Sequence, residues 1–542
     1  MDLNSGYLSP DYTRLYLKAR AETERREAKR RPRIRVWDKD WNYVSEFYGE
    51  ISAKFGRKIY DSAPGEIETY ADHPLRRWMT EELKDEEDIH FTVDTAWDRW
   101  SGKVSHLQLK SNGNNRDRLT IHLLDEYEHL KKITCYSNPF LPPEFQFPKI
   151  WMYAGPSVFG IKSILFSNLK RRFAPLWALP ENIYDSSSWR LNLNPENWPI
   201  FIMPGSLLND TSMWTVIATR FGNAHDVITP ILKDAGLCIT YHRWLPGDPQ
   251  PAPSHATLTK PTLVIDVVDK SGVRGPSGNM VDGLLSFVSR IASDGVQEIV
   301  ETVNPGAPPP EYDTPGFFGT KKELPWVFYR NAMRTGLSGI SSWEMNIHKA
   351  LAGAIVTGGK SPGWVNSGIK LILNAVLGYI GLIFGNPSLA IGIFEKYVED
   401  VILAFHRVGL SNRQELMGRG QYGEHWEPVS GTGFSLPALQ AFRVGQLKTR
   451  AYTSFKISVR DGAPYWYGKH MTIGDRVVGE INDSKNLYVD QIFASELTWS
   501  RSQDPIRNLS IGDDSAEDPL GSLLGRQLEQ VRAIIQSIAV ES

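Results

Sequence analysis

The longest uncharged stretch of the chain limits how it can fold. GIKLILNAVLGYIGLIFGNPSLAIGIF runs from Gly368 to Phe394, and no residue from Leu371 to Phe394 is charged. A helix that spans a bilayer core needs about 20 apolar residues. A segment of this kind must be hidden in a membrane or against protein, because an exposed apolar surface of this size promotes aggregation.

A break in the middle of the stretch favours a hairpin over a single span. Asn386-Pro387-Ser388 interrupts the apolar run. Leu371 to Phe384 would form about 21 Å of helix at 1.5 Å per residue, which is shorter than a bilayer core. The second part meets Glu395 and the amphipathic run FEKYVEDVILAF. We therefore predict a helical hairpin over residues 371–394.

The composition is that of a soluble globular protein with several domains. The chain has 542 residues, of which 41% are hydrophobic and 23% charged, and its mean hydropathy is −0.32. A net charge of −2 excludes a global basic field for nucleic acid.

Cys135 and Cys238 cannot form a disulfide framework or a zinc site, so we expect reduced, buried thiols. The N-terminus lacks the pattern of a signal peptide, and none is expected.

Hydrophobic periodicity predicts an α+β, multidomain chain with two β-rich regions around a central insertion. Strand-like alternation marks the two β-rich regions, and helical spacing marks the ends of the chain and part of the insertion. The predicted segments are a charged helix or arm at 1–32, a first β-rich domain at 33–145, a mixed α/β insertion at 146–330, a helical insertion at 331–446, a second β-rich domain at 447–515 and an amphipathic C-terminal helix at 516–542.

Four local patterns make sharper predictions. RIRVWDKDWNYVSEF alternates as one half-buried strand, and DSAPGEIETYA is typical of a Pro-Gly turn followed by a strand. Phe147 to Arg172 has helical spacing, with Ile161, Ile164, Leu165 and Leu169 on one face. YTSFKISVRDGAPYWYG predicts a strand, an Asp-Gly turn and an aromatic strand.

Two glycine-rich motifs have the wrong context for nucleotide binding. AIVTGGKS, at 354–361, lacks the first glycine of a phosphate loop, and Pro362-Gly363 follow where a helix should begin. GRGQYG, at 418–423, matches Gly-x-Gly-x-x-Gly without a strand before it or a helix after it. We interpret both as loops, and we predict no cofactor.

The remaining polar candidates do not form a catalytic set. His242, His255, His425 and His470 are not spaced as metal ligands, so packed or surface imidazoles are expected. Asp269 and Asp282 are expected to bond their own backbone in turns, whereas Asp266 lies in an apolar run and needs a partner if it is buried. The 17 tryptophans fit subunit interfaces better than a sugar platform.

Several blocks together resemble a minor tail protein family of actinobacterial, mycobacteriophage-type siphophages. The first is VWDKDWNYVSEFYGEISAKF with DSAPGEIETYADHP. LVIDVVDKSGVRGPSGNMVDGLLSFV and DGAPYWYGKHMTIGDRVV are similar to two further blocks, and a long apolar segment between two β regions is also a family feature. The resemblance covers roughly 33–499, and none of its blocks is a catalytic signature.

The resemblance implies a tail-tip or baseplate hub protein in the virion, assembled in the bacterial host cytoplasm. Such hubs are homotrimers in which two β-barrel-like domains per subunit imitate the sixfold tail tube. The implied partners are the distal tail protein, the tape measure protein, other minor tail proteins or the central fibre, and phage DNA that passes through without sequence-specific binding. A near-neutral chain suits such a conduit, because a strongly cationic lining would hold the phosphates.

A trimer would offer the apolar hairpin a burial site on its axis, or against a neighbouring tail protein. The alternative is a stored membrane-active element that makes transient contact with the host membrane. The residues expected to carry either role are Leu371, Ile372, Leu373, Val376, Leu377, Tyr379, Ile380, Leu382, Ile383 and Phe384. The competing function is a cell-wall-degrading or glycan-binding tail enzyme with an unrecognised carboxylate pair. We predict a structural protein that is not an enzyme.

Overall fold

The computed structural model describes most of the chain, and the described part is mainly β-sheet. The described residues are 10–113, 115–148, 150–174, 194–292, 301–303, 312, 315–316, 319–331, 339–358, 405–409, 411–428, 445, 448–462, 464–481 and 486–512. The predicted hairpin at 371–394 and the predicted C-terminal helix at 516–542 lie outside them.

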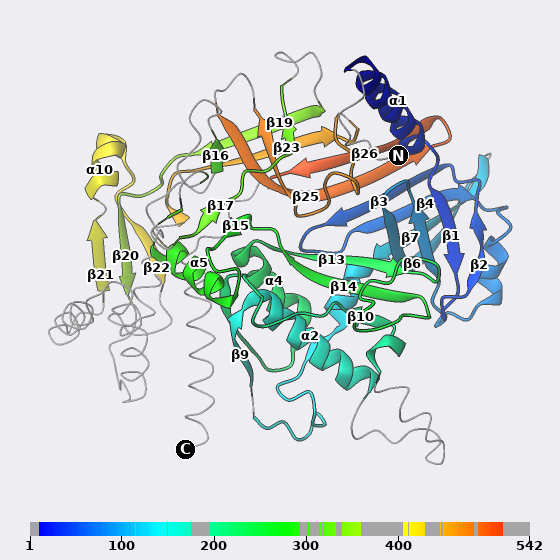
Figure 1. Cartoon of the computed structure of the whole chain (residues 1–542), viewed down its shortest axis with the longest axis horizontal. Coiled ribbons are helices and arrows are strands. Elements are labelled where there is room, and N and C mark those ends of the chain that lie inside the picture. Colours follow the sequence, from blue (N-terminus) through cyan, green and yellow to red (C-terminus); the bar gives the residue numbers. More distant parts are fainter. Residues whose placement is uncertain are drawn as a thin grey trace.

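One large sheet runs through both β-rich regions (Figure 1). Its path is β19 (Ile340–His348), β23 (Tyr452–Arg460), β26 (Gln503–Ile511), β25 (Leu487–Ser500), β3 (Ser52–Lys58), β4 (Pro64–Tyr70), β7 (Asn115–Asp125), β6 (Arg99–Asn112), β5 (His90–Asp94), β1 (Arg33–Trp37) and β2 (Tyr43–Phe47). β16 (Glu301–Val303) and β24 (Arg476–Glu480) also pair with β25, and β18 (Phe328–Tyr329) pairs with β24.

The two β-rich regions meet where β25 pairs with β3. The antiparallel register runs from Ala494 opposite Lys58 to Ser500 opposite Ser52. The described chain is mostly β-sheet, and the expected β-barrel-like domains are not closed: among the described strands, no ladder joins β2 back to the rest of the path. The domain boundaries stay predictions.

Each β-rich region has its own core, and each core takes a residue from the other region. The first core contains Phe55 and Trp100 together with Leu497 and Trp499 of β25. The second core contains the strand residues of β23 and β26 together with Ile59, which follows β3. Burial of apolar surface therefore couples the two regions.

A third core lies between helices and small sheets of the central layer (Figure 1). Its helices are α2 (Ser157–Phe173) and α4 (Ala224–Ala235), and its strands include β9 (Trp151–Pro156), β11 (Trp214–Thr219), β10 (Ile200–Ile202), β14 (Thr262–Asp269) and β13 (Leu237–Trp244). Asn223 caps α4 by accepting the N–H of His225, and Gly236 ends it at φ 64°, where a side chain would be strained.

Short elements complete the chain around these layers. They are α1 (Pro10–Ala28), the π-helical turn η1 (Trp78–Glu82), the 3-10 helices η2 (Glu126–Lys132), η3 (Pro195–Asn197) and η4 (Gly418–Gly420), the strand pairs β8 (Thr134–Cys135) with β12 (Gly222–Asn223) and β15 (Val273–Arg274) with β17 (Lys321–Lys322), helices α5 (Met280–Ala292) and α10 (Ser411–Met417), and a sheet of β21 (Phe405–Gly409), β20 (Ala354–Gly358) and β22 (His425–Pro428).

Many expected elements are confirmed. The charged N-terminal helix appears as α1. The four apolar residues chosen for α2 are all buried. Both cysteines are free and buried, as expected. No helix among the described residues is long and apolar enough to cross a membrane.

Other expectations are wrong, each for a local reason. The predicted single strand at 33–47 is the β1–β2 hairpin, because the Asp38 carboxylate accepts the N–H groups of Asp40 and Asn42 in a turn. Pro64 begins strand β4 rather than a turn, as its missing N–H permits at a first strand position. The helix predicted from Phe147 begins only at Ser157, after strand β9.

Two further corrections concern the second half of the chain. The described residues of the predicted helical insertion at 331–446 are mostly strands, and β19 joins the large sheet. The aromatic run after Asp461-Gly462 is not a strand but a compact loop. Its residues bond within the loop instead of along a ladder, since the N–H of Tyr467 is donated to Asp461 Oδ1 at 2.7 Å.

We expect Phe55→Ala to lower the free energy of unfolding of the whole sheet by ~3–5 kcal/mol. Phe55 is 2% exposed, and its ring lies 4.7 Å from Trp100 and 5.4 Å from Trp499 of the other region. Urea denaturation followed by fluorescence and circular dichroism measures the effect. Leu109→Ala, at a 51% exposed site on β6, is the control with little change. Separate transitions of which only one shifts would contradict a shared core.

Candidate functional site

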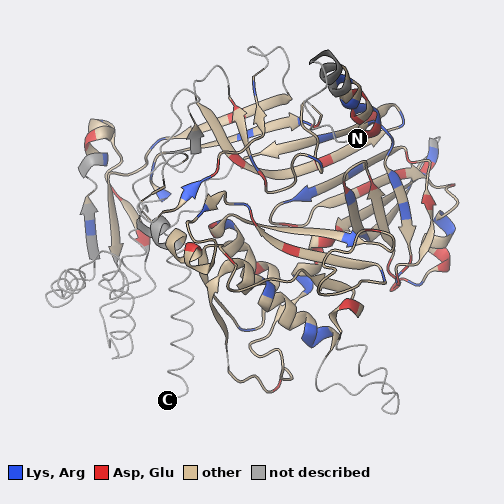
Figure 2. Ribbon diagram, in the orientation of Figure 1, with Lys and Arg blue, Asp and Glu red and all other residues tan. Residues whose placement is uncertain are grey.

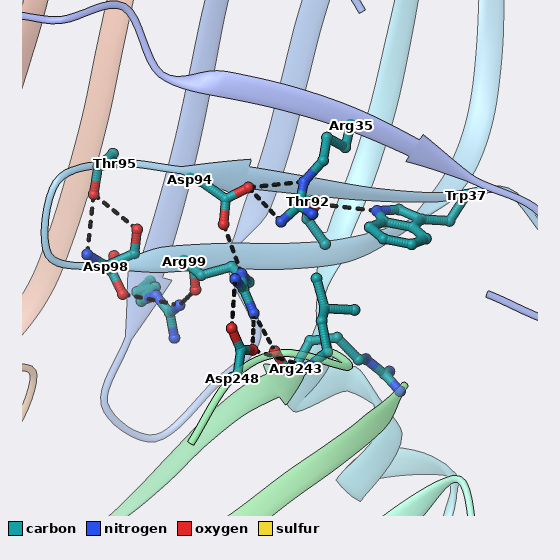
Figure 3. A network of polar contacts seen from close by, with 11 residues as sticks. Arg35, Trp37, Thr92, Asp94, Thr95, Asp98, Arg99, Arg243 and Asp248 are labelled. Carbon is teal, nitrogen blue, oxygen red and sulfur yellow. Dashed lines mark hydrogen bonds and ion pairs between the residues drawn. The ribbon is translucent and has the colours of Figure 1, made fainter. Parts of the chain in front are cut away.

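The most heavily charged buried site lies where the central layer meets the large sheet. Its members come from β1, β3, β5, β6, β13 and β26, from the 3-10 helix η2 and from the loops after β5 and β13, and Figure 3 shows the part around Arg99. We call it the polar junction. It consists of Arg35, Arg57, Asp94, Asp98, Arg99, Glu126, Arg243, Asp248 and Arg507.

Arg99 is the bridge between the sheet and the central layer. Its guanidinium donates to Asp94 Oδ1 at 2.6 Å and forms an ion pair with Asp248, in the loop after β13 (Figure 3). It also donates to the carbonyl oxygen of Arg243 at 3.1 Å. Arg35 donates to Asp94 Oδ2 at 2.6 Å and 3.0 Å, so that carboxylate binds two guanidinium groups. Planar, multidentate pairs of this kind fix orientation as well as distance.

Asp98 holds three parts of the chain together. It accepts from Arg57 of β3 at 3.4 Å and from Arg507 of β26 at 3.1 Å. Arg57 also donates to the carbonyl oxygen of Tyr241 in β13, at 3.3 Å. Burial alone would raise the pKa of the Asp98 carboxyl, but the two guanidinium groups outweigh it and hold the pKa below its usual value. Asp98 therefore stays charged and binds both β-rich regions to the central layer.

Arg243 and Glu126 form the most deeply buried ion pair. Their side chains are 3% and 2% exposed, and the shortest N–O distances are 2.7 Å. The indole of Trp41 lies 3.9 Å from the guanidinium, and His129 Nε2 lies 3.1 Å from Glu126 Oε2. Burial opposes the charge on Glu126, yet Arg243 holds the pKa of that carboxyl far below its usual range.

The buried acid Asp125 does not have a full counter-charge, and its pKa is raised. Its carboxylate accepts from the Tyr241 hydroxyl at 2.6 Å and from the N–H of Tyr127 at 3.2 Å. These hydrogen bonds and the nearby Arg57 favour the charged form, but burial dominates and raises the pKa of Asp125 to about 7. Beside the polar junction there is thus an acid, Asp125, whose pKa is raised toward neutral pH.

The acids chosen from sequence have structural partners, as expected. Asp266 pairs with Lys162 at 2.6 Å. Asp269 accepts the N–H of Ser271, and Asp282 accepts the N–H groups of Ser277 and Gly278. These contacts fix turns and helix ends rather than bring carboxylates together.

The chosen histidines also stand apart from one another. His425 Nε2 lies 3.1 Å from Glu427 Oε2, and His470 Nδ1 accepts the N–H of Trp466 at 2.9 Å. His242 is exposed on β13, and His255 Nδ1 lies 2.9 Å from the Ser254 hydroxyl. Among the residues that the structure describes, no three His, Cys, Asp or Glu side chains could hold a metal ion.

One of the two glycine-rich motifs has the reverse of a nucleotide-binding context. GRGQYG follows helix α10 and precedes strand β22, whereas a dinucleotide site needs the strand first and the helix second. AIVTGGKS begins in strand β20, and its last residues lie outside the described part. The ten residues predicted in Leu371–Phe384 also lie outside it.

Sequence reasoning missed the polar junction. One signal was present: Arg243 stands in the apolar strand LCITYHRW, and a buried arginine needs a partner. The partner, Glu126, is far away in the sequence, and only the packing of η2 against β13 brings the two together.

Arg243→Met should lower the free energy of unfolding by ~3–5 kcal/mol, because it leaves the buried Glu126 carboxylate without its guanidinium partner and with His129 alone beside it. Adding Glu126→Gln should recover part of this loss. Chemical denaturation of the single and double variants measures both effects. Arg116→Gln, which breaks an exposed pair with Asp72, is the matched control at ~0–1 kcal/mol. A double variant as unstable as the single one would contradict the argument.

Asp125→Asn should change how stability depends on pH. The folded state keeps the Asp125 proton up to about pH 7, whereas the unfolded state loses it near pH 3.9. The native acid therefore contributes stability that is full below about pH 4 and lost as pH rises through 7. The variant lacks this loss. Its free energy of unfolding, compared with that of the native protein, should therefore increase from about pH 4 to 7, by an amount on the order of 2–4 kcal/mol.

Urea denaturation across this pH range measures the advantage of the Asp125→Asn variant. Glu144→Gln, at an exposed loop position, removes the same charge and should leave the pH profile unchanged. A constant difference between Asp125→Asn and the native protein at all pH values would contradict the assigned titration.

Comparison with known proteins places the chain among phage tail proteins. Residues 33–513 match the family of siphovirus ReqiPepy6 Gp37-like proteins. Minor tail protein Gp28 of Mycobacterium phage D29 is 28% identical over 503 residues, which cover 82% of this chain and 84% of that protein. Minor tail protein Gp28 of Mycobacterium phage L5 is 29% identical over 462 residues, which cover 75% and 77%.

A solved tail protein from Neisseria meningitidis MC58 is similar at a TM-score of 0.36 and 9% identity, over 89% of this chain and 97% of that one. The match over 33–513 spans nearly all of the described sheet, and the resemblance seen in the sequence blocks is confirmed. The chain belongs to the siphovirus ReqiPepy6 Gp37-like protein family.

Proposed function

We propose that the protein is a structural minor tail protein that forms a trimeric hub at the tail tip of a siphophage. In this role it joins the distal tail protein ring to the central fibre or spike. It also surrounds the channel for the tape measure protein and DNA. Family membership and the two mycobacteriophage relatives support a place in the virion tail.

The observation that carries the proposal is the continuous sheet through two β-rich regions. Each region has its own core, and the β25–β3 pairing fixes one region against the other. A subunit with two such regions can supply two neighbouring positions of a ring, so three subunits supply six. Closed rings of identical chains need heterologous interfaces with a fixed angle, and a rigid subunit provides that angle.

The polar junction supports a structural role for the buried charges. Asp98, Glu126 and Asp248 are each bound by arginine, and the arginines come from other parts of the chain. Such pairs cost desolvation energy, but they specify one relative arrangement of the packed layers. A hub that joins a ring to a fibre requires one arrangement.

The charge distribution fits the proposed channel. Lys and Arg are interspersed with Asp and Glu over the described ribbon (Figure 2). A mixed, near-neutral surface holds DNA phosphates weakly, which lets DNA pass. We propose that 371–394 is buried on the trimer axis or against a neighbouring tail protein, and that contact with the host membrane is its alternative role.

Light scattering of the purified protein across a concentration series should give about three times the mass of 61.2 kDa for one chain. Cross-linking of intact virions should give the same trimer, and gold-labelled antibody should mark the tail tip. A monomer both in solution and in particles would contradict the hub, as would label along the whole tube. Clearing of purified cell wall that one Asp or Glu substitution abolishes would favour the enzyme instead.

A further inference from the structure

A cavity of about 350 Å³ lies between helix α1 and the aromatic loop 461–470. Helix α1 rests beside the ends of β25 and β26 (Figure 1). Glu24 of α1 pairs with Lys469 of the loop, and Arg31 donates to the carbonyl oxygens of Ser500 and Arg501 at 3.1 Å and 3.3 Å. The C-terminal end of the helix is therefore fixed as one wall of the cavity.

The opposite wall is a tryptophan pair held in place by two glycines. The rings of Trp97 and Trp466 lie 5.5 Å apart at 42°. Gly462, at φ 82°, has the Trp466 ring where a Cβ would stand, and Gly468, at φ 81°, packs on the backbone of Trp97 in the same way. Both indoles are half-buried and both line the cavity.

Hydrogen bonds inside the loop make this wall rigid. His470 Nδ1 accepts the N–H of Trp466 at 2.9 Å, and Asp461 Oδ1 accepts the N–H of Tyr467 at 2.7 Å. A recognition surface that is ordered before binding loses less conformational entropy when a ligand arrives. Aromatic rings held in this way suit contact with the face of a ligand ring.

The lining of the cavity is strongly cationic. Arg25, Lys29, Arg30, Arg460 and Arg507 line it, and Asp461 is the one acid among the lining residues. Within the described part of the chain, Arg25, Arg30 and Arg460 have no ion pair, while Lys29 reaches Asp504 only at 4.0 Å and Arg507 pairs with Asp98. Guanidinium groups without a carboxylate partner are available for an oxyanion.

A structural explanation covers only part of this charge. Arg25, Lys29 and Arg30 lie at the C-terminal end of α1, where cations complement the negative end of the helix dipole. Arg507 is already bound by Asp98, but Arg460 of strand β23 has no ion pair among the described residues, and the helix dipole does not account for it. Arg25, Arg30 and Arg460 thus line one small space without a carboxylate partner in the described part of the chain, and an anion that enters it would lower their mutual repulsion.

We propose that this cavity binds a sugar unit that carries an oxyanion, a phosphate or a carboxylate. The ring would stack on the tryptophan pair while the oxyanion contacts Arg460 and the basic end of α1. The volume is in the range of a small-molecule site and suits one ring with one charged group. The two indoles contact each other at a tilt, which leaves no slot for a flat base between them. A nucleic acid strand would also need a continuous cationic groove along its backbone.

Calorimetric titration of the full-length protein tests the proposal, with intrinsic tryptophan fluorescence beside it. The probes are glucose 1-phosphate, glucuronate, glucose, inorganic phosphate and thymidine 5′-monophosphate. We expect glucose 1-phosphate or glucuronate to bind about tenfold more tightly than glucose and inorganic phosphate. Which of the two binds identifies the oxyanion. Added salt should weaken that binding, since the contact is ionic.

Arg460→Gln should weaken binding of the preferred probe about fivefold or more, with Arg30→Gln as a second variant in case the first fails to fold. Lys132→Gln removes the same charge at an exposed site outside the cavity and should leave binding unchanged. Unchanged thermal unfolding would show that each variant is folded.

Several results would overturn the proposal. They are no binding of either charged sugar in the low-millimolar range, equal binding of glucose or inorganic phosphate, or tighter binding of the nucleotide. Equal effects of Arg460→Gln and Lys132→Gln would overturn it too. The hub proposal does not depend on this result, because trimer mass and tail-tip labelling are measured without a ligand.

Discussion

The antiparallel pairing of β25 with β3 is the contact on which the rest of the structure depends. It joins strands almost 450 residues apart in the chain into one hydrogen-bonded ladder. Two cores form on either side of it, and each includes a residue from the opposite region, such as Trp499 or Ile59. Strand pairing fixes the register of the two regions, and shared apolar burial makes their separation costly.

Buried charge then sets how the central layer lies on this sheet. Apolar packing tolerates small shifts, whereas a guanidinium bound to two carboxylates accepts only one arrangement. Arg99, between Asp94 and Asp248, and its neighbour Asp98, between Arg57 and Arg507, impose that restriction where the β5–β6 turn leads into β6 (Figure 3). The cost of desolvation is offset because the buried charges of the polar junction have partners, whereas burial raises the pKa of Asp125, which has a weaker partner, to about 7.

Local patterns predicted many of the elements and failed where side chains or remote strands intervened. Helical spacing was sufficient for the buried face of α2, and the charged run at the N-terminus was sufficient for α1. The Asp38 turn split one predicted strand, because a single carboxylate that binds two N–H groups outweighs alternation. Strand β19 was not predicted, because its pairing with β23 makes it a strand and its own sequence does not show a strand pattern.

The sequence by itself determined the two β-rich regions, the burial of Cys135 and Cys238 and the family. These properties follow from composition, short-range periodicity and blocks that resemble the family, which are local. Only the tertiary structure decided that both regions share one open sheet, that Arg243 meets Glu126, and that Trp97 and Trp466 line one cationic cavity with α1. Each of these depends on contacts between distant segments. The energy of such a contact cannot be inferred from the sequence of either segment alone.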